Sequence, residues 1–234
     1  LNTLQACLEP GCWSLNFLNE GLWWQGTMLA AEAAAGLSLI AGYFSSVSCF
    51  VAWIVWTSIL RRTEPAANAG DYWMACLLYW GMFLPLGDMF SIDSLSKKKK
   101  EYATISLASA AFLTQVLVVY LYAGISKLQG DWLNGSAVGY VLSVHDHGTW
   151  VGEFLNTSRI ATSFLTASTL LLEIVGPLLF LFCGNRSMRR YIAFFFILFH
   201  IGIWITLSVG MFSPIGITAW IALIPWRTNR AEPY

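Results

Sequence analysis

Four side chains in this apolar sequence could do acid–base chemistry: Glu32, Lys127, Glu173 and His200. Glu32, Glu173 and His200 stand inside long apolar runs, and ionisable groups at membrane depth commonly mark a functional site or a contact between helices. Lys127 stands at the end of such a run. A partly desolvated lysine amine can act as a base, whereas most lysines at a helix end simply extend toward the membrane surface.

The depths of Glu173 and His200 in their runs favour a contact between them, directly or through one water. At 1.5 Å per residue, Glu173 lies roughly 18 Å and His200 roughly 12–15 Å from the outer edge. A short loop joins the two runs, which predicts antiparallel neighbours. This contact has two interpretations: a hydrogen bond that holds two helices together, and a proton-handling or ligand site. Together with Glu32, the two side chains form a predicted intramembrane polar network.

The other candidate side chains make less specific patterns. His145 and His147 flank Asp146 in one loop, but a third ligand is lacking, so no metal site is predicted. Cys7 and Cys12 are spaced C-x4-C on the predicted outer side, where a disulfide is permitted. Two free thiols are the alternative for this pair.

The composition indicates that membrane helices must position these groups. Of the 234 residues, 57% are hydrophobic and only 11% are charged, against roughly 25% charged residues in soluble domains. The mean hydropathy is +0.61. Twelve tryptophans suit a protein that meets two membrane–water interfaces. The net charge of zero gives no electrostatic case for nucleic acid.

Apolar runs of the length that spans a bilayer, about 20 residues, recur along the chain. They predict an all-α, polytopic transmembrane bundle of about six or seven helices. No internal repeat is present, so one domain is expected over residues 1–234, with an outer segment (1–21), the bundle (22–226) and a cytoplasmic tail (227–234). The predicted spans are Leu22–Tyr43, Val47–Leu60, Tyr72–Phe90, Tyr102–Ile125, Ala161–Phe182, Tyr191–Ser208 and, shorter than the rest, Ile215–Trp226.

The distribution of Lys and Arg predicts the orientation of this bundle. Alternating crossings place nine of the 13 positive charges on one side, among them Lys97–Lys100 and Arg186–Arg190. The positive-inside rule makes that side cytoplasmic. The N-terminal segment and the loop Lys127–Ile160 then lie on the exoplasmic or lumenal side. Within this loop, the apolar spacing of Asp131–His145 predicts a helix at the membrane interface.

Three stretches follow one another along the chain: Asn68–Tyr72 with Phe83–Asp93, Val119–Leu128 with Asp131–Gly135, and the Leu-rich run around Glu173 with Phe199-His200 and Val209–Phe212. In this order they resemble the horizontally transferred transmembrane (HTTM) domain family, which includes the vitamin K-dependent gamma-carboxylases. The second stretch is similar to the family pattern Y-x-x-A-G-x-x-K-L followed by D-W-x-x-G. The resemblance extends over roughly residues 14–226.

The resemblance implies that Lys127 matches the lysine base of the carboxylases, which deprotonates vitamin K hydroquinone. Two differences from the carboxylases argue against assigning their activity to this sequence. Where the carboxylases have an Asn-His pair, this sequence has Ala69 and Gly70. The carboxylases also have a large lumenal domain after the bundle, whereas this sequence ends at Tyr234.

Two functions of different classes therefore remain. The first is a non-catalytic accessory or assembly subunit of a larger membrane complex, whose partners are lipids and other membrane subunits. The second is a membrane enzyme that acts on a quinone-like or lipid substrate with Lys127 as base. The candidate ligands are a lipid, a quinone or a pigment. A transporter is disfavoured, because paired broken helices and inverted repeats are not evident.

Overall fold

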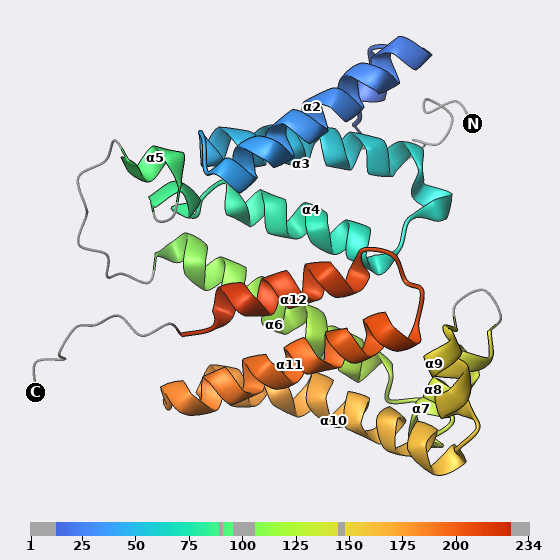
Figure 1. Cartoon of the computed structure of the whole chain (residues 1–234). Helices are drawn as coiled ribbons and strands as arrows, with labels where there is room; N and C mark the ends of the chain where they lie inside the picture. Colours follow the sequence, from blue (N-terminus) through green and yellow to red (C-terminus); the bar gives the residue numbers. More distant parts are fainter. Residues whose placement is uncertain (1–12, 89–90, 96–105, 145–147, 226–234) are drawn as a thin grey trace, which may run out of the picture. The chain divides into compact units, whose positions relative to one another are not determined.

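Helices make up the architecture of this protein (Figure 1). The computed structural model describes residues 13–88, 91–95, 106–144 and 148–225. In these ranges the chain is all-α, and its extended pairing is limited to one isolated bridge between Gly148 and Leu207. The chain divides into two compact units, Leu1–Phe112 and Leu113–Tyr234, which are described separately. The expectation of one domain stays a prediction.

Three helices form the frame of the first unit: α2 (Leu22–Ala41), α3 (Ser45–Arg62) and α4 (Ala69–Gly81). Helix α3 packs against both α2 and α4 (Figure 1). The turn from α2 to α3 needs Gly42, because its φ is +64° and a Cβ at this position would overlap Ser91.

A buried polar cluster fastens the start of the first unit to α3. The 3₁₀ turn η1 (Leu15–Phe17) is followed by α2, and Asn16 within it is fully buried. The Asn16 side-chain amide donates to the carbonyl of Ser58 at 2.9 Å, and the Ser58 hydroxyl accepts from the Leu15 amide at 3.0 Å. These bonds satisfy polar groups that burial would otherwise leave unpaired.

Short elements complete the first unit around the three long helices. A capping box at Asn68 and Asp71 starts α4. The Asn68 side chain accepts from backbone amides of the first turn, and the Asp71 side chain accepts from the Asn68 amide. The remaining elements are η2 (Glu64–Ala66), η3 (Leu86–Asp88) and α5 (Ile92–Leu95).

The second unit is built on four longer helices. They are α6 (Leu107–Ser126), which begins in the first unit, α10 (Arg159–Phe182), α11 (Arg186–Thr206) and α12 (Phe212–Leu223). Helices α11 and α12 form an antiparallel pair, and α10 packs on α11 (Figure 1). The core is aromatic: Phe196 stacks on Trp220 with ring centroids 4.0 Å apart and an interplanar angle of 8°.

Three short helices connect α6 to α10: α7 (Gly130–Leu133), α8 (Ala137–Ser143) and α9 (Trp150–Asn156). The prediction that Asp131–His145 is helical is confirmed over the described part, but as two helices. The chain turns at Gly135, whose φ is +75°. A residue in this left-handed conformation interrupts a right-handed helix, so two short helices form instead of one. Glycine adopts the conformation at little cost.

Among the described residues, three helices are long and apolar enough to cross a membrane: α6, α10 and α11. They correspond to the predicted spans Tyr102–Ile125, Ala161–Phe182 and Tyr191–Ser208. Only 22%, 33% and 22% of their apolar windows are buried inside the protein. The remainder, which is half-buried or exposed, fits contact with lipid or with other apolar helices.

The predicted span Tyr72–Phe90 is not one helix. Helix α4 ends at Gly81, and its 13 residues rise only about 20 Å, less than the ~30 Å of bilayer hydrocarbon. Pro85 prevents the helix from continuing past Leu84, because a proline disfavours the helical conformation of the residue before it. The predicted Ile215–Trp226 span corresponds to α12, which has 12 residues and is a shorter apolar helix.

Candidate functional site: two polar pairs in the second unit

Lys127 and Glu173 form a partly buried ion pair. Lys127 directly follows the last residue of α6, and its Nζ lies 2.8 Å from Oε1 and 2.6 Å from Oε2 of Glu173 on α10. The side chain of Glu173 is only 6% exposed and that of Lys127 is 23% exposed. The pair therefore joins the end of α6 to the middle of α10, with the lysine on its more open side.

Gly124 makes this ion pair possible, because it lets the two backbones approach each other. A Cβ on Gly124 would lie 2.7 Å from Cγ1 of Ile174 and 3.1 Å from Cβ of Glu173. Small residues at helix contacts are typical of membrane bundles for this reason. The Ala123-Gly124 sequence thus brings the start of the Lys127 side chain within reach of Glu173.

An aromatic ring lies beside the ammonium of Lys127. The centroid of the Trp132 ring lies 5.1 Å from Nζ, within the range of a cation–π interaction. Trp132 belongs to α7, directly after the loop that follows Lys127. The lysine is therefore held by a carboxylate from α10 and by an indole from its own chain segment.

Tyr120 and His200 form a second polar pair. The Tyr120 hydroxyl lies 2.6 Å from Nε2 of His200, and both side chains are buried. Which atom donates depends on the histidine tautomer. The imidazole also meets the ring of Phe212, and Gly216 on α12 leaves space for it, since a Cβ there would overlap the ring.

The two pairs extend from one face of α6. Tyr120 and Lys127 are seven residues apart, which corresponds to about two helical turns and about 10 Å along the axis. Tyr120 bonds to α11 and Lys127 bonds to α10. Because Tyr120 on α6 and Lys127 directly after it are bonded to two other helices, this arrangement constrains both the depth and the rotation of α6 in the second unit.

These partners differ from the predicted ones. A contact between Glu173 and His200, directly or through one water, was expected, yet both carboxylate oxygens of Glu173 bond to Lys127, and Nε2 of His200 bonds to Tyr120. Equal depth did not make them direct partners, because the depth of a residue does not give the direction in which its side chain leaves the helix. A contact through one water stays a prediction.

The other predicted site residues lie elsewhere. Glu32 is half-buried on α2 in the first unit, and its Oε2 is buried without a hydrogen-bond partner among the described residues. Cys7 and Cys12, and likewise His145 and His147, fall outside the described residues. Within the described part of the chain, no cluster of three potential metal ligands is present.

Sequence reasoning missed Tyr120 and Trp132 as site residues. Both were visible in the motif that carries Lys127, since Tyr120 begins the pattern Y-x-x-A-G-x-x-K-L and Trp132 belongs to the D-W-x-x-G that follows it. A tyrosine in the middle of an apolar helix is a signal in itself, because a buried hydroxyl usually finds a partner. Ala69 and Gly70, in contrast, form the first turn of α4 and bring no chemically active side chain to it.

Comparison with known proteins identifies one family. The model of the HTTM domain matches residues 15–225 of the chain. The match begins at η1 and ends just after α12, so it includes both units and all the residues of the two polar pairs. A search of solved structures found no match.

Proposed function

This chain belongs to the HTTM domain family, and on that premise we propose that it is a non-catalytic accessory or assembly subunit of a larger membrane complex. In this proposal the two polar pairs hold the bundle together. They do not perform a reaction.

The observation that carries this proposal is the pair of hydrogen bonds that Lys127 Nζ donates to both carboxylate oxygens of Glu173. A general base must offer a free electron pair to the proton that it removes. An ammonium that donates to both oxygens of a nearly buried carboxylate offers none. Removing that proton would also leave the Glu173 charge without its counter-ion in an apolar environment, which is costly.

Two further features support a role in assembly. Ala69 and Gly70 supply no acid or hydrogen-bond donor from their side chains, unlike the Asn-His pair that the family resemblance associates with catalysis. The spans α6, α10 and α11 leave most of their apolar windows outside the buried core. Such surfaces fit lipid and partner helices.

The proposal includes the full number and orientation of the spans. We infer six or seven crossings, in which α2, α3 and the shorter α4 and α12 join the three long apolar helices. The N-terminal segment and the loop Lys127–Ile160 are placed on the exoplasmic or lumenal side, and Lys97–Lys100 on the cytoplasmic side, because of the Lys and Arg distribution.

A second candidate function is favoured by one observation. The Lys127 side chain keeps 23% of its surface exposed, and its ammonium lies beside the Trp132 ring. A planar, quinone-like substrate that stacked on Trp132 and displaced Glu173 would meet a lysine amine. This candidate is an enzyme with Lys127 as base.

One experiment separates the two functions. The full chain is purified from its native membrane in mild detergent, and both its stoichiometric protein partners and its turnover of vitamin K hydroquinone are measured. We expect a stable complex and no epoxide. The matched variants are Lys127→Ala and Lys127→Arg, and the latter keeps a charge that can pair with Glu173. Epoxide formation that is lost in both variants would overturn the proposal and establish the enzyme.

A further inference from the structure

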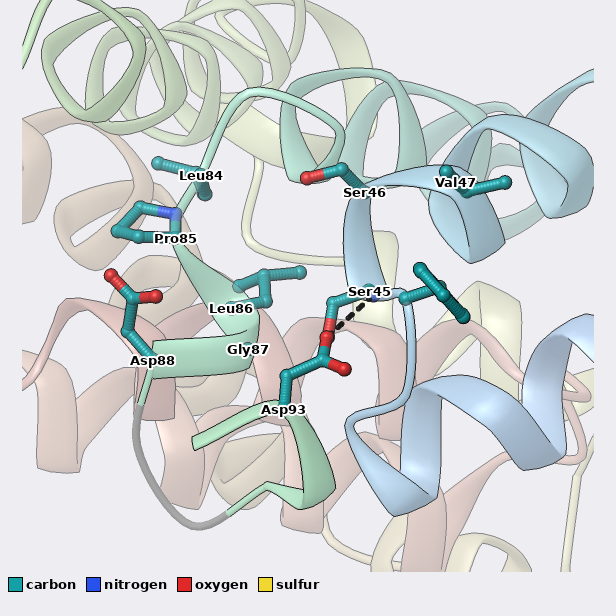
Figure 2. Close-up of a pocket in the computed structure, with 10 residues that line it drawn as sticks. Ser45, Ser46, Val47, Leu84, Pro85, Leu86, Gly87, Asp88 and Asp93 are labelled. Carbon is teal, nitrogen blue, oxygen red and sulfur yellow. Dashed lines mark hydrogen bonds between the residues drawn. The ribbon is translucent and has the colours of Figure 1, made fainter. Parts of the chain in front are cut away.

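A short helix is attached to the end of a long helix in each unit of this chain. In the first unit, α5 is attached to the start of α3. Oδ2 of Asp93 accepts from the Ser45 amide at 3.4 Å (Figure 2), and the Asp93 amide donates to the Gly42 carbonyl at 3.1 Å. Asp93 thereby caps α3, because Phe44 at the N-cap position makes no capping bond with its side chain. In the second unit, α9 is attached to the end of α11.

Three contacts hold α9 against the last turn of α11. The Thr149 amide donates to the Thr206 carbonyl at 3.1 Å, and the Thr149 hydroxyl donates to the Ile205 carbonyl at 2.6 Å. Gly152 permits a close approach, because a Cβ on it would overlap the Thr206 carbonyl oxygen. The start of α9 therefore lies at the level at which α11 ends.

The sequence of α11 defines the depth of this level in a membrane. Helix α11 is long and apolar enough to cross, and its 21 residues rise about 31 Å, close to the ~30 Å of bilayer hydrocarbon. Arg186 and Arg189 in its first turn belong at one membrane surface. Thr206, the last residue of α11, then reaches the opposite surface.

Helix α10 gives the same depth for α9. It begins at Arg159, shortly after Asn156 ends α9, and it is also long and apolar enough to cross. Figure 1 shows α8 and α9 at the end of the second unit where α11 ends and α10 begins. Both neighbours therefore place α9 at a boundary between membrane and water.

Helix α9 directs an aromatic face away from the rest of its unit. Gly152 marks the side that contacts α11. Trp150 and Phe154 lie one turn apart on the opposite side, since each residue advances about 100° around a helix, and they are 81% and 71% exposed. The first turns of α10 repeat this pattern with Ile160 and Phe164, which are 85% and 69% exposed. Several large apolar side chains at one boundary are typical of a membrane contact.

We propose that α9 is an interfacial membrane anchor, in which Trp150 and Phe154 bind the boundary between lipid headgroups and acyl chains. An indole suits this level, because its ring is apolar and its N–H donates to headgroups or water. Lipid is the occupant because Ile160 and Phe164 extend the apolar surface along a helix that can cross the membrane. This inference rests on the crossing of α10 and α11, which is part of the proposed function.

The test measures the depth of α9 in a bilayer by spin labelling of the full chain. Single cysteines are introduced into a cysteine-free chain as Trp150→Cys, Phe154→Cys and, as the control on the same helix, Glu153→Cys, because Glu153 is polar and exposed. The labelled chains are reconstituted in phosphatidylcholine liposomes. Electron paramagnetic resonance then compares collisions with oxygen, which concentrates among acyl chains, and collisions with a water-soluble nickel chelate.

We expect a several-fold higher ratio of oxygen to nickel collisions for Trp150→Cys and Phe154→Cys than for Glu153→Cys. A fourth variant, Phe195→Cys, reports on the crossing itself, because Phe195 is 57% exposed near the middle of α11. Its ratio should be the highest of the four. If Trp150→Cys fails to fold, Phe154→Cys decides the question.

The reference variant separates failure of the anchor from failure of the crossing. When Phe195→Cys reports acyl chains, ratios at Trp150→Cys and Phe154→Cys no higher than at Glu153→Cys would overturn the anchor. Immobile labels on α9 that meet neither reagent would also overturn it, because they would indicate a protein contact. A label at Phe195→Cys that meets the nickel chelate would overturn the crossing of α11, and the anchor with it.

Discussion

The hydroxyl of Tyr120 and Nε2 of His200 lie 2.6 Å apart in the aromatic core of the second unit. This bond and the Lys127–Glu173 pair start from the same face of α6 and end on different helices, α11 and α10. The position of α6 therefore depends on two polar contacts, and each can be tested by substitution.

The two halves of the ion pair should respond differently to substitution. Lys127→Ala leaves the carboxylate of Glu173, which is 6% exposed, without a counter-ion, and we expect a loss of about 3 kcal/mol in the free energy of unfolding. Glu173→Ala should cost only about 1 kcal/mol, because the long lysine side chain can extend its ammonium toward water. Thermal or denaturant unfolding in detergent measures both values.

The double variant Lys127→Ala/Glu173→Ala is the control for this pair. It should cost less than the sum of the single variants, because neither charge is left alone. Additive losses would mean that the ion pair contributes no coupling.

Tyr120→Phe should destabilise the second unit by about 1–2 kcal/mol, because it removes the hydroxyl bonded to His200 and keeps the ring packing. Tyr122→Phe is the matched control, since Tyr122 lies on the same helix and is 75% exposed. Unfolding midpoints of the two variants give the comparison. Equal effects would contradict a structural role for the Tyr120–His200 bond.

Gly216→Ala should destabilise the chain by about 1–3 kcal/mol or prevent folding, because the added methyl group overlaps the His200 ring. Gly202→Ala provides the control on the neighbouring helix α11, since a Cβ there meets no atom within 4 Å. It should be neutral or stabilising, because alanine favours a helix by about 1 kcal/mol over glycine. A yield or unfolding measurement in which both variants behave alike would refute this difference.

The predicted orientation can be tested by labelling single cysteines in a cysteine-free chain. Gly148→Cys should react with an impermeant reagent added on the exoplasmic side, and Lys98→Cys only after the membrane is opened. The reason is the excess of Lys and Arg on the predicted cytoplasmic side. Labelling of both cysteines from one side would exclude this topology.

Apolar run length was sufficient to locate α6, α10 and α11, because a membrane helix needs little more than composition and length. It failed at Tyr72–Phe90, because the apolar residues continue past Pro85, whereas helix α4 ends at Gly81. Similarly, the apolar spacing of Asp131–His145 predicts helix and contains no signal for the left-handed turn at Gly135 other than the glycine itself.

The sequence identified the polar residues of the site but not which of them contact one another. Ionisable side chains in apolar runs identified Lys127, Glu173 and His200, but their partners depend on helix rotation, which residue counting does not give. Gly124 was the informative position, because the close approach that it permits decides which helix Glu173 faces. Read with Tyr120, it would have indicated that the two groups find their partners in the segment Tyr120–Lys127 and not in each other.

The capping of α3 by Asp93 has a consequence for biosynthesis. The first turn of α3 receives its carboxylate from a residue 48 positions later in the chain. While the ribosome is still making α4, the start of α3 therefore has no cap, and the turn that follows α2 lacks the contacts of Gly42 with residues 91–93. The α2–α3 hairpin can insert into the membrane early. Its turn becomes complete only after α4 and the segment that contains Asp93 have been synthesised and Asp93 has packed against Gly42 and Ser45.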